Sequence, residues 1–541
     1  MKKTLSFLLI FVFLLGVLPV QAEEEGVFTY RALIDPAAII TGYTGEIDGE
    51  LIIPDTIDGL PVIAIAGDAF EEREDITSLR LPEGLQDIGQ AAFKDCRSLT
   101  EVSLPSTLKD VGNYAFASCT ALTEIAIPGN YTRIGAHAFG HCPSLTTATL
   151  QEGVRSIEDY AFANCTALGE MTIPDSVEQM GKDVFYESAL AAESRWQQEG
   201  LYVDSWLVAV KEDANGTFTV KEGTRGLCDW AFATRAALTN ITLPDGLLHI
   251  GHWAFQECTG LTEMTIPDSV TYIGIDAFET CENLTYITLP KNLERLEHGA
   301  FVGCRSLKSV HLPDGVTHLY ESTFADCQSL AEITFSPNLT DIDNGVFAYC
   351  WALTEAIIPE GVTQIGNEAF VDCVNLTRLT LPSTLRSIGI QAFGSCHNLG
   401  NITIPRHMRS IGNGAFSMCK NIKEVTFEGY VSDMGTAFSD CSFTAQYDSA
   451  LWPAEALQNY GGTIEWVPTT HIGDVDGDGT ITSTDARLVL QYYAGKVNET
   501  ALNIAVADVD SDGAITSTDA RLILQYYAGK IEVFPEGSAV E

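Results

Sequence analysis

The spacing of the cysteines constrains this fold more than any other feature of the sequence. All but one of the fourteen follow a 23-residue interval, with a gap after Cys165 and a last interval one residue short. A phenylalanine stands three residues before each of them, and Phe70, Phe185 and Phe232 continue that series where the cysteine is missing. The spaced cysteines are Cys96, Cys119, Cys142, Cys165, Cys258, Cys281, Cys304, Cys327, Cys350, Cys373, Cys396, Cys419 and Cys441. A fixed period of this size is typical of a solenoid, whose coils bury apolar side chains only by stacking.

One coil can be followed through residues 99–119. Apolar and polar residues alternate over 99–104, which predicts a short strand, and Pro105 ends it. Gly112 follows in a turn, and Phe116 is expected to point inward before Cys119 closes the unit. The repeat therefore predicts a β-solenoid with a parallel sheet and coils of about 23 residues.

The same period changes what the cysteines indicate. Cysteines in a secreted protein normally suggest disulfides. Equivalent residues of stacked strands, however, lie about 4.8 Å apart with parallel Cβ vectors, whereas a disulfide needs Cβ atoms that turn towards each other. We therefore expect free, buried thiols that act as small hydrophobes. Zinc is the alternative, but the chain has no CxxC pair and no histidine in register.

The repeated units resemble the BspA-type leucine-rich repeats of bacterial surface and secreted proteins. Residues 261–281, LTEMTIPDSVTYIGIDAFETC, carry the motif, and the resemblance covers about residues 28–441. It implies a right-handed leucine-rich-repeat β-solenoid with a parallel sheet on one side. Members of this family are described as adhesins, as binders of host or matrix proteins, or without an assigned function, so the resemblance implies a binding role without naming the ligand.

The repeat rhythm breaks between Phe185 and Phe232. Residues 201–210 and 217–220 flank Asp213–Gly216, and this pattern predicts a hairpin. The segment is either a binding knob on the solenoid or an irregular repeat that packs its own aromatic residues, and we favour the second. Its aromatic cluster comprises Trp196, Tyr202 and Trp206.

One outward strand position carries a row of threonines, of which Thr265 and Thr288 are examples. A threonine ladder is a stable β-surface in its own right, so its structural role is favoured over a ligand site. Sugar-binding platforms usually stack sugar rings on aromatic side chains, and Tyr286 is the one such residue on this face. A carbohydrate site there has little support from the sequence.

The composition changes abruptly at Asp474, where an EF-hand-like loop begins. Its oxygen-bearing residues fall at loop positions 1, 3, 5 and 12, Gly479 stands at position 6, and positions 7 and 9 offer further oxygens. Calcium prefers six to eight oxygen ligands, and carboxylates crowded in this way repel one another without a cation. The candidate ligands are Asp474, Asp476, Asp478, Thr480, Thr482 and Asp485.

A second copy of this loop begins at Asp508, and residues 474–496 and 508–530 differ at three positions only. Each loop leads into a predicted helix with apolar residues at helical spacing, and Gly495 or Gly529 ends it. The duplication is a much stronger signal than one acidic loop, and it predicts two calcium ions. The candidate ligands of the second loop are Asp508, Asp510, Asp512, Ala514 (through its carbonyl), Thr516 and Asp519.

The paired units look like a type I dockerin, over the whole of residues 474–530. In that family such a small all-α, EF-hand-like module binds calcium and docks onto a cohesin module of a scaffoldin, commonly within cellulosomes that degrade polysaccharides. The near-identity of the halves implies that either helix can dock. Where many relatives carry a basic pair on the helix, this chain has Leu-Gln, which leaves the particular cohesin open. The resemblance implies cohesin contacts at Ser483, Thr484, Leu490, Gln491, Ser517, Thr518, Leu524 and Gln525.

The N-terminus predicts export. Lys2 and Lys3 precede an apolar run over residues 5–18, and Ala22 ends a small-x-small cleavage pattern. The run is short for a membrane span of about 20 residues, so we expect cleavage after Ala22 and an extracellular protein. The formal net charge of −43 repels phosphate backbones and anionic lipid surfaces, which argues against nucleic acid and membrane partners.

These assignments leave little room for a catalytic domain. We expect a signal peptide over 1–22, a solenoid over 23–443 with the irregular segment near 186–231, a cap and linker over 444–471 and the calcium module over 472–534. The irregular segment is smaller than the ~100 residues that an independent catalytic domain needs, and no nucleophile motif, phosphate loop or HExxH appears. We therefore predict a non-catalytic interaction protein. The alternatives are a polysaccharide-active enzyme, such as a glycoside hydrolase with an unrecognised site, and a protease inhibitor.

Overall fold

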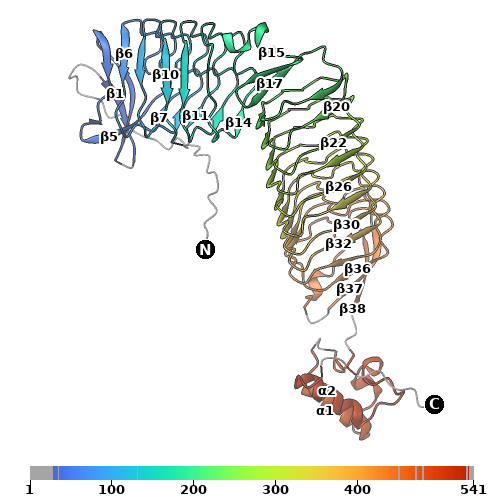
Figure 1. The fold of residues 1–541 in the computed structure, drawn as a ribbon. Coiled ribbons are helices and arrows are strands. Elements are labelled where there is room, and N and C mark those ends of the chain that lie inside the picture. Colours follow the sequence, from blue (N-terminus) through green and yellow to red (C-terminus); the bar gives the residue numbers. More distant parts are fainter. Residues whose placement is uncertain are drawn as a thin grey trace. The chain divides into compact units, whose positions relative to one another are not determined.

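The computed structural model describes residues 28–34, 36–130, 132–448, 451–468, 472–477, 480–531 and 534. By its internal contacts the chain divides into a first unit, Met1–Val210 with Gly226–Asp229, and a second unit, Lys211–Arg225 with Trp230–Glu541. In both units the repeats form a parallel β-solenoid (Figure 1), in which each regular coil contributes a strand to each of two ladders. The expected solenoid is confirmed.

The first unit opens with an antiparallel pair, β1 (Phe28–Ala32) and β2 (Ala38–Tyr43). From β5 on, paired residues on neighbouring short strands lie one repeat apart, as Arg133 does from Asp110 and Ser156. The ladder that continues from β2 contains β5 (Leu60–Ile65), β7 (Asp87–Ile88), β9 (Asp110–Val111), β11 (Arg133–Ile134), β13 (Ser156–Ile157) and β14 (Gln179–Met180), with β4 (Thr56–Ile57) antiparallel to β5. The other strands form two shorter sheets. One contains β3 (Gly49–Ile52), β6 (Ile76–Arg80) and β8 (Glu101–Ser103), and the other contains β10 (Glu124–Ile127) and β12 (Thr147–Leu150).

The second unit repeats this plan with longer runs. Its short strands are β21 (His249–Ile250), β23 (Tyr272–Ile273), β25 (Arg295–Leu296), β27 (His318–Leu319), β29 (Asp341–Ile342), β31 (Gln364–Ile365), β33 (Ser387–Ile388) and β35 (Ser410–Ile411). The other strands form a series of short parallel sheets. Four are pairs: β18 (Gly216–Thr219) with β20 (Leu238–Thr242), β22 (Glu263–Thr265) with β24 (Tyr286–Thr288), β26 (Ser309–His311) with β28 (Glu332–Thr334), and β30 (Glu355–Ile357) with β32 (Arg378–Thr380). The last sheet contains β34 (Ile402–Ile404), β36 (Glu424–Phe427), β37 (Ser442–Tyr447) and β38 (Thr463–Pro468).

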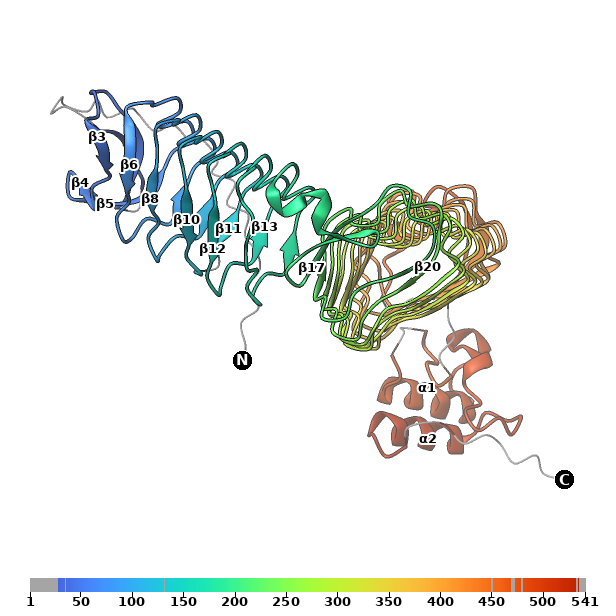
Figure 2. The ribbon, with the colours of Figure 1, turned by 45° about the horizontal axis from the view of Figure 1, so that its top comes forward.

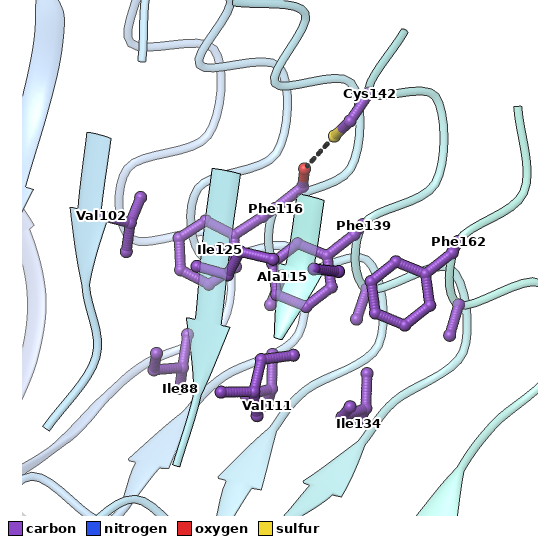
Figure 3. Close-up of a cluster of buried hydrophobic side chains, with 14 of the residues drawn as sticks. Ile88, Val102, Val111, Ala115, Phe116, Ile125, Ile134, Phe139, Cys142 and Phe162 are labelled. Carbon is purple, nitrogen blue, oxygen red and sulfur yellow. Dashed lines mark hydrogen bonds between the residues drawn. The ribbon is translucent and has the colours of Figure 1, made fainter. Parts of the chain in front are cut away.

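The phenylalanine series forms the centre of each solenoid. Within the first unit the rings of Phe93 and Phe116 stack with centroids 5.2 Å apart, and those of Phe116 and Phe139 lie 5.4 Å apart. Figure 3 shows the rings of Phe116, Phe139 and Phe162 in a row above Val111 and Ile134. Phe70, Phe185 and Phe232 are also buried. The ring that each coil adds is covered by the rings of the neighbouring coils. An isolated coil could not bury its own ring, so each coil depends on its neighbours for stability.

The cysteines occupy a second buried row beside the rings. All fourteen are free and buried, as expected, including Cys228, which lies outside the 23-residue series. The thiol of Cys142 donates a hydrogen bond to the carbonyl oxygen of Phe116, at 3.3 Å (Figure 3). Burial raises the pKa of the thiols, to about 12 for Cys96 and Cys165. Each thiol of the spaced series therefore serves as a small apolar group that also satisfies a buried carbonyl.

This burial predicts protected thiols. A maleimide reagent at mildly alkaline pH should modify none of the fourteen cysteines in the native chain and all of them in denaturant, as counted by mass spectrometry. Because the folded state holds the thiols protonated above their ordinary pKa, the solenoid should lose stability as the pH rises from about 9 towards about 12. Six or more disulfides in the denatured, unreduced chain would contradict this assignment.

The irregular segment is a meander that continues the solenoid. After η1 (Ala189–Ala191) and η2 (Glu193–Arg195), the strands β15 (Trp196–Gln197), β16 (Gly200–Val203) and β17 (Trp206–Val210) pair antiparallel, and β17 then pairs parallel with β19 (Gly226–Leu227). The antiparallel hairpin thus turns at Asp204 and Ser205. The prediction of a hairpin turn at Asp213–Gly216 was wrong, because β18 begins at Gly216 and pairs parallel with β20.

Aromatic packing explains the position of this turn. Trp206 is 2% exposed and Tyr202 is 9% exposed, so both rings belong to the core rather than to a surface knob. A Cβ atom on Gly226 would lie 2.4 Å from the Trp206 ring, so only glycine lets β19 pack there. The burial supports the interpretation as an irregular repeat that packs its own aromatic residues.

An aromatic cluster covers the last coils of the second unit. Trp466 lies within β38, and its ring centroid is 5.6 Å from that of Phe427 and 5.0 Å from that of Trp452. Trp452 follows β37 and precedes η3 (Ala454–Ala456). The ladder therefore runs through Pro468, so that residues 444–447 and 463–468 of the segment expected to form a cap and linker, 444–471, pair as strands of the solenoid. The large rings replace the next coil as the cover of the core.

The remaining described elements lie near the C-terminus. Helices α1 (Ser483–Tyr493) and α2 (Ser517–Tyr527) lie against each other (Figure 2), and η4 (Glu499–Ala501) and η5 (Ile504–Val506) connect them. Their shared core contains Val475, Ala486 and Val489 from the first half. Val509, Ala520 and Ile523 are the equivalent residues of the second half. This pairing confirms the small all-α module.

Candidate metal centre and docking surface

The first acidic loop brings three carboxylates together ahead of α1. Oxygen atoms of Asp474, Asp476 and Asp485 all lie within 4.8 Å of one another. Asp474 is 6% exposed and Asp485 is fully buried. Asp476 is exposed. Three carboxylates at this separation offer hard oxygen ligands to a cation.

Local hydrogen bonds explain how Asp485 reaches the loop. Its Oδ1 accepts hydrogen bonds from the backbone N–H groups of Val475, at 2.7 Å, and Asp476, at 3.1 Å. Its Oδ2 accepts from the N–H of Thr482, at 2.8 Å, while the Thr482 hydroxyl accepts from the N–H of Thr484, at 3.0 Å. This capping box begins α1 and ties the helix to the loop. The same carboxylate thus caps the helix and faces the other two acids.

The second loop repeats this geometry. Oxygen atoms of Asp508, Asp510 and Asp519 lie within 4.8 Å of one another. Asp519 is fully buried and accepts from the N–H groups of Val509 and Thr516, both at 2.8 Å, in a second capping box. Because the two loops carry equivalent residues in equivalent contacts, the module contains two candidate metal centres.

The electrostatics of the second loop suit a cation. Partial burial raises the pKa of Asp510, and the charges of Asp519, Asp512 and Asp508 raise it further. Within the described part of the chain, no basic side chain pairs with Asp485 or Asp519, whose recorded partners are backbone N–H and threonine hydroxyl groups. The donor set is made of oxygens alone, which fits Ca²⁺ and does not fit a thiol- or imidazole-preferring metal.

The other predicted ligands are placed less uniformly. Asp478 lies outside the described residues. Asp512 is not part of the second carboxylate group, and its Oδ1 accepts from the N–H of Ala514, at 2.8 Å. The hydroxyl groups of Thr482 and Thr516 are engaged in the capping boxes. Thr480 and Ala514 lie in the loops, with Ala514 exposed.

The predicted docking residues lie on an accessible part of the module. Leu490 is 43% exposed and Leu524 is 42% exposed, so the two halves present an equivalent apolar residue. Ser483 and Ser517 are exposed, whereas Thr484, Gln491, Thr518 and Gln525 are half-buried. None of the eight is buried, as a contact surface requires.

Two tyrosines extend this surface beyond the predicted set. Tyr493 is 59% exposed and Tyr527 is 58% exposed, each three residues after the exposed leucine of its helix. Residues at this spacing share a helix face. Neither tyrosine was among the predicted docking residues, although their occurrence at the same place in both halves was a usable signal.

Two families account for most of the chain. The family described as BspA type leucine rich repeat region matches residues 63–191, 225–354 and 340–447, in six copies. The dockerin type I domain matches residues 472–527. A type I dockerin is a calcium-binding module that binds cohesins and directs cellulosome assembly, and a leucine-rich repeat array is an interaction module. Domains of both kinds are typically non-catalytic.

Solved structures of repeat proteins are also similar to this chain. A leucine-rich repeat protein from Bacteroides ovatus is 26% identical, with 72% of this chain and 95% of that chain covered and a TM-score of 0.34. A leucine rich cell surface protein from Faecalibacterium prausnitzii is 26% identical, with 70% and 94% covered and a TM-score of 0.27. A comparison with curated proteins gave no significant match.

The helices bear on membrane association as well. None of those in the described ranges combines the length and apolar character that crossing a bilayer requires.

The repeat array spans more than half of the chain, and the paired acidic loops stand where the dockerin match lies. The chain therefore belongs to the BspA-type leucine-rich repeat family and carries a C-terminal type I dockerin module.

Proposed function

We propose that this protein is a secreted, non-catalytic interaction protein that docks onto a cohesin-bearing scaffold while its solenoid binds a further partner. The partner is a protein or a cell-wall polysaccharide. The N-terminal pattern at residues 1–22, which lies outside the described residues, supports export. The attachment is extracellular, on a cellulosome-type complex.

The duplicated loop-and-helix geometry carries this proposal. Asp474, Asp476 and Asp485 converge in one loop, and Asp508, Asp510 and Asp519 converge in the other. Each set would hold one Ca²⁺, with Asp478 and Asp512 as further candidate carboxylates and with Thr480, Thr482, Ala514 and Thr516 as candidates at loop positions 7 and 9. When bound, calcium would neutralise the negative charges of the loop carboxylates. The chain's own residues then keep α1 and α2 in position for docking.

The proposed non-catalytic role is supported by the way the described residues are distributed between the two modules. The solenoid and the dockerin module account for nearly all described residues, and the irregular segment is built into the solenoid through β17 and β19. Within the described ranges, the two modules leave no stretch of the ~100 residues that an independent catalytic domain needs.

Calcium dependence of docking is the direct test. Isothermal titration of the full chain with cohesin modules encoded in the same genome should show binding in calcium and none in excess chelator. At a calcium concentration ~1,000 times the dissociation constant, each site stabilises the module by about 4 kcal/mol, so chelation should melt the dockerin and leave the solenoid folded. The proposal fails if no cohesin binds in calcium, or if binding and helicity survive chelation.

A further inference from the structure

A shallow hollow lies on the outward face of β20, β22 and β24 in the second unit. Its volume is about 470 Å³. Asn240, Glu263 and Tyr286 occupy equivalent outward positions on these three strands, one repeat apart, and Thr265 and Thr288 stand beside them. Asp245, from the turn after β20, contributes another carboxylate to the lining. The hollow is therefore a polar surface with a single large ring.

The ring of Tyr286 is positioned for contact with a ligand. It is 52% exposed, and among the outward positions of β20 to β36 it is the only tyrosine, phenylalanine or tryptophan. The ammonium group of Lys308, from the next coil, lies 5.3 Å from the ring centroid. This contact shows that the ring accepts a cation within this chain. Lys308 does not line the hollow, which extends from Tyr286 towards Glu263 and Asn240.

Negative charge accompanies the ring. Neither Glu263 nor Asp245 has a basic partner within ion-pair distance in the described part of the chain. Elsewhere on the same face, Glu355 pairs with Arg378, and Lys291 pairs with Asp268 at the equivalent turn of the next coil. In the described part of the chain, Glu263 and Asp245 thus lack the basic partner that Glu355 and Asp268 have.

The geometry points to a subsite for an arginine side chain of a partner protein, with the guanidinium on Tyr286 and beside Glu263, which is paired with Tyr286 across β22 and β24, while Asp245 adds negative charge to the lining. A guanidinium is planar, stacks on aromatic rings and pairs with carboxylates through a fork of donors, whereas an ammonium is a strongly hydrated point charge. The inference rests on the proposed function in taking the solenoid as the partner-binding part of the chain.

Charge complementarity favours this occupant over the other candidate for the hollow. A neutral sugar would use the same ring and hydroxyl groups, but it would leave the two unpaired carboxylates without a counter-charge. A basic segment from another protein supplies that charge, and the net charge of −43 steers it towards this chain.

Titration of the full chain with fluorescein-labelled tetra-arginine tests the subsite, with tetra-lysine and cellohexaose as parallel probes. At physiological salt, where general attraction is screened beyond about 8 Å, tetra-arginine should bind more tightly than tetra-lysine. Tyr286→Ala should weaken tetra-arginine binding by about 3- to 30-fold, and Tyr286→Phe, which keeps the ring, should leave it close to that of the native chain. Glu263→Gln should weaken it by about 2- to 5-fold.

The matched control is Glu332→Gln, which removes the same charge from an exposed outward position on β28, away from the hollow. Its affinity should match that of the native chain. The inference is overturned if tetra-arginine does not bind, if Glu332→Gln weakens it as much as Glu263→Gln does, if tetra-lysine binds equally well, or if cellohexaose alone responds to Tyr286→Ala. Cohesin capture measured on the same samples separates the two proposals, because it depends on the dockerin and not on Tyr286.

Discussion

Replacement of Asp474 and Asp508 together by alanine is expected to abolish cohesin binding by the full chain, whereas either replacement alone should weaken it less than about tenfold. Each aspartate belongs to one of the two carboxylate groups. The helices that follow them expose Leu490 and Leu524 to nearly the same extent, so one intact half still presents a docking surface. The double variant loses the cation from both loops and with it about 4 kcal/mol per site under saturating calcium. Isothermal titration against one cohesin measures all three variants.

A matched control is available within the module. Glu499 is exposed in η4 and outside both carboxylate groups, so Glu499→Gln changes a charge without touching a loop. Its cohesin affinity should equal that of the native chain. Calcium-dependent binding by the double variant, or complete loss of binding in one single variant, would contradict the assignment of two equivalent halves.

Phe301→Ala is expected to destabilise the second solenoid by about 3–5 kcal/mol without affecting docking. The ring is fully buried and lies between Phe278, at 5.1 Å, and Phe324, at 5.5 Å. Its removal leaves a cavity and uncovers both neighbours, and a stack of coils cannot close such a gap by moving one side chain. Denaturant unfolding followed by circular dichroism measures the loss.

The control for this substitution is Ile357→Ala. Ile357 is 54% exposed at an outward strand position, and its truncation should change the free energy of unfolding by no more than about 0.5 kcal/mol. Equal effects of the two substitutions would show that the phenylalanine row does not dominate the core. Calcium-dependent cohesin binding by Phe301→Ala should be retained, because the dockerin has a separate core.

The repeat made much of this fold predictable. The 23-residue interval placed Phe232 and Phe185 in the core even where the neighbouring cysteine is replaced by Arg235 or Ser188. It also indicated free thiols, because a ladder of equivalent positions points its side chains in one direction. The acidic loops were predictable for the same reason, since Asp474 and Asp508 each begin a nearly identical segment.

The irregular segment was less predictable because its local signals compete. Asp213–Gly216 has the composition of a tight hairpin turn, yet the chain turns at Asp204 and Ser205 instead. The packing of Trp206 against Gly226 and the parallel pairing of β18 with β20 favour that choice. The local turn propensity contributes less free energy to folding than the burial of a tryptophan ring does.

Backbone conformation shows the same division between local and tertiary effects. Tyr114 and Trp253 adopt positive φ angles of 60° and 52°, a region that residues with a Cβ atom rarely enter. Nothing in their side chains favours it. Their N–H groups donate to carbonyls of the next coil, Tyr114 to Ala136 and Trp253 to Ile275, both at 2.8 Å. Hydrogen bonds between coils hold these turns in a conformation that the isolated segment would avoid.

By itself, the sequence determined the period, the buried rows and the duplicated acidic loops, because each of these depends on which residue types recur at which spacing. The tertiary structure alone decided where the irregular coil turns, which residues take left-handed backbone angles, and that Asp485 and Asp519 cap their helices while facing the other acids. It also placed Tyr286 next to Glu263 in a hollow whose lining includes Asp245. These features depend on contacts between coils or between loop and helix, whose energies outweigh the preferences of any single segment.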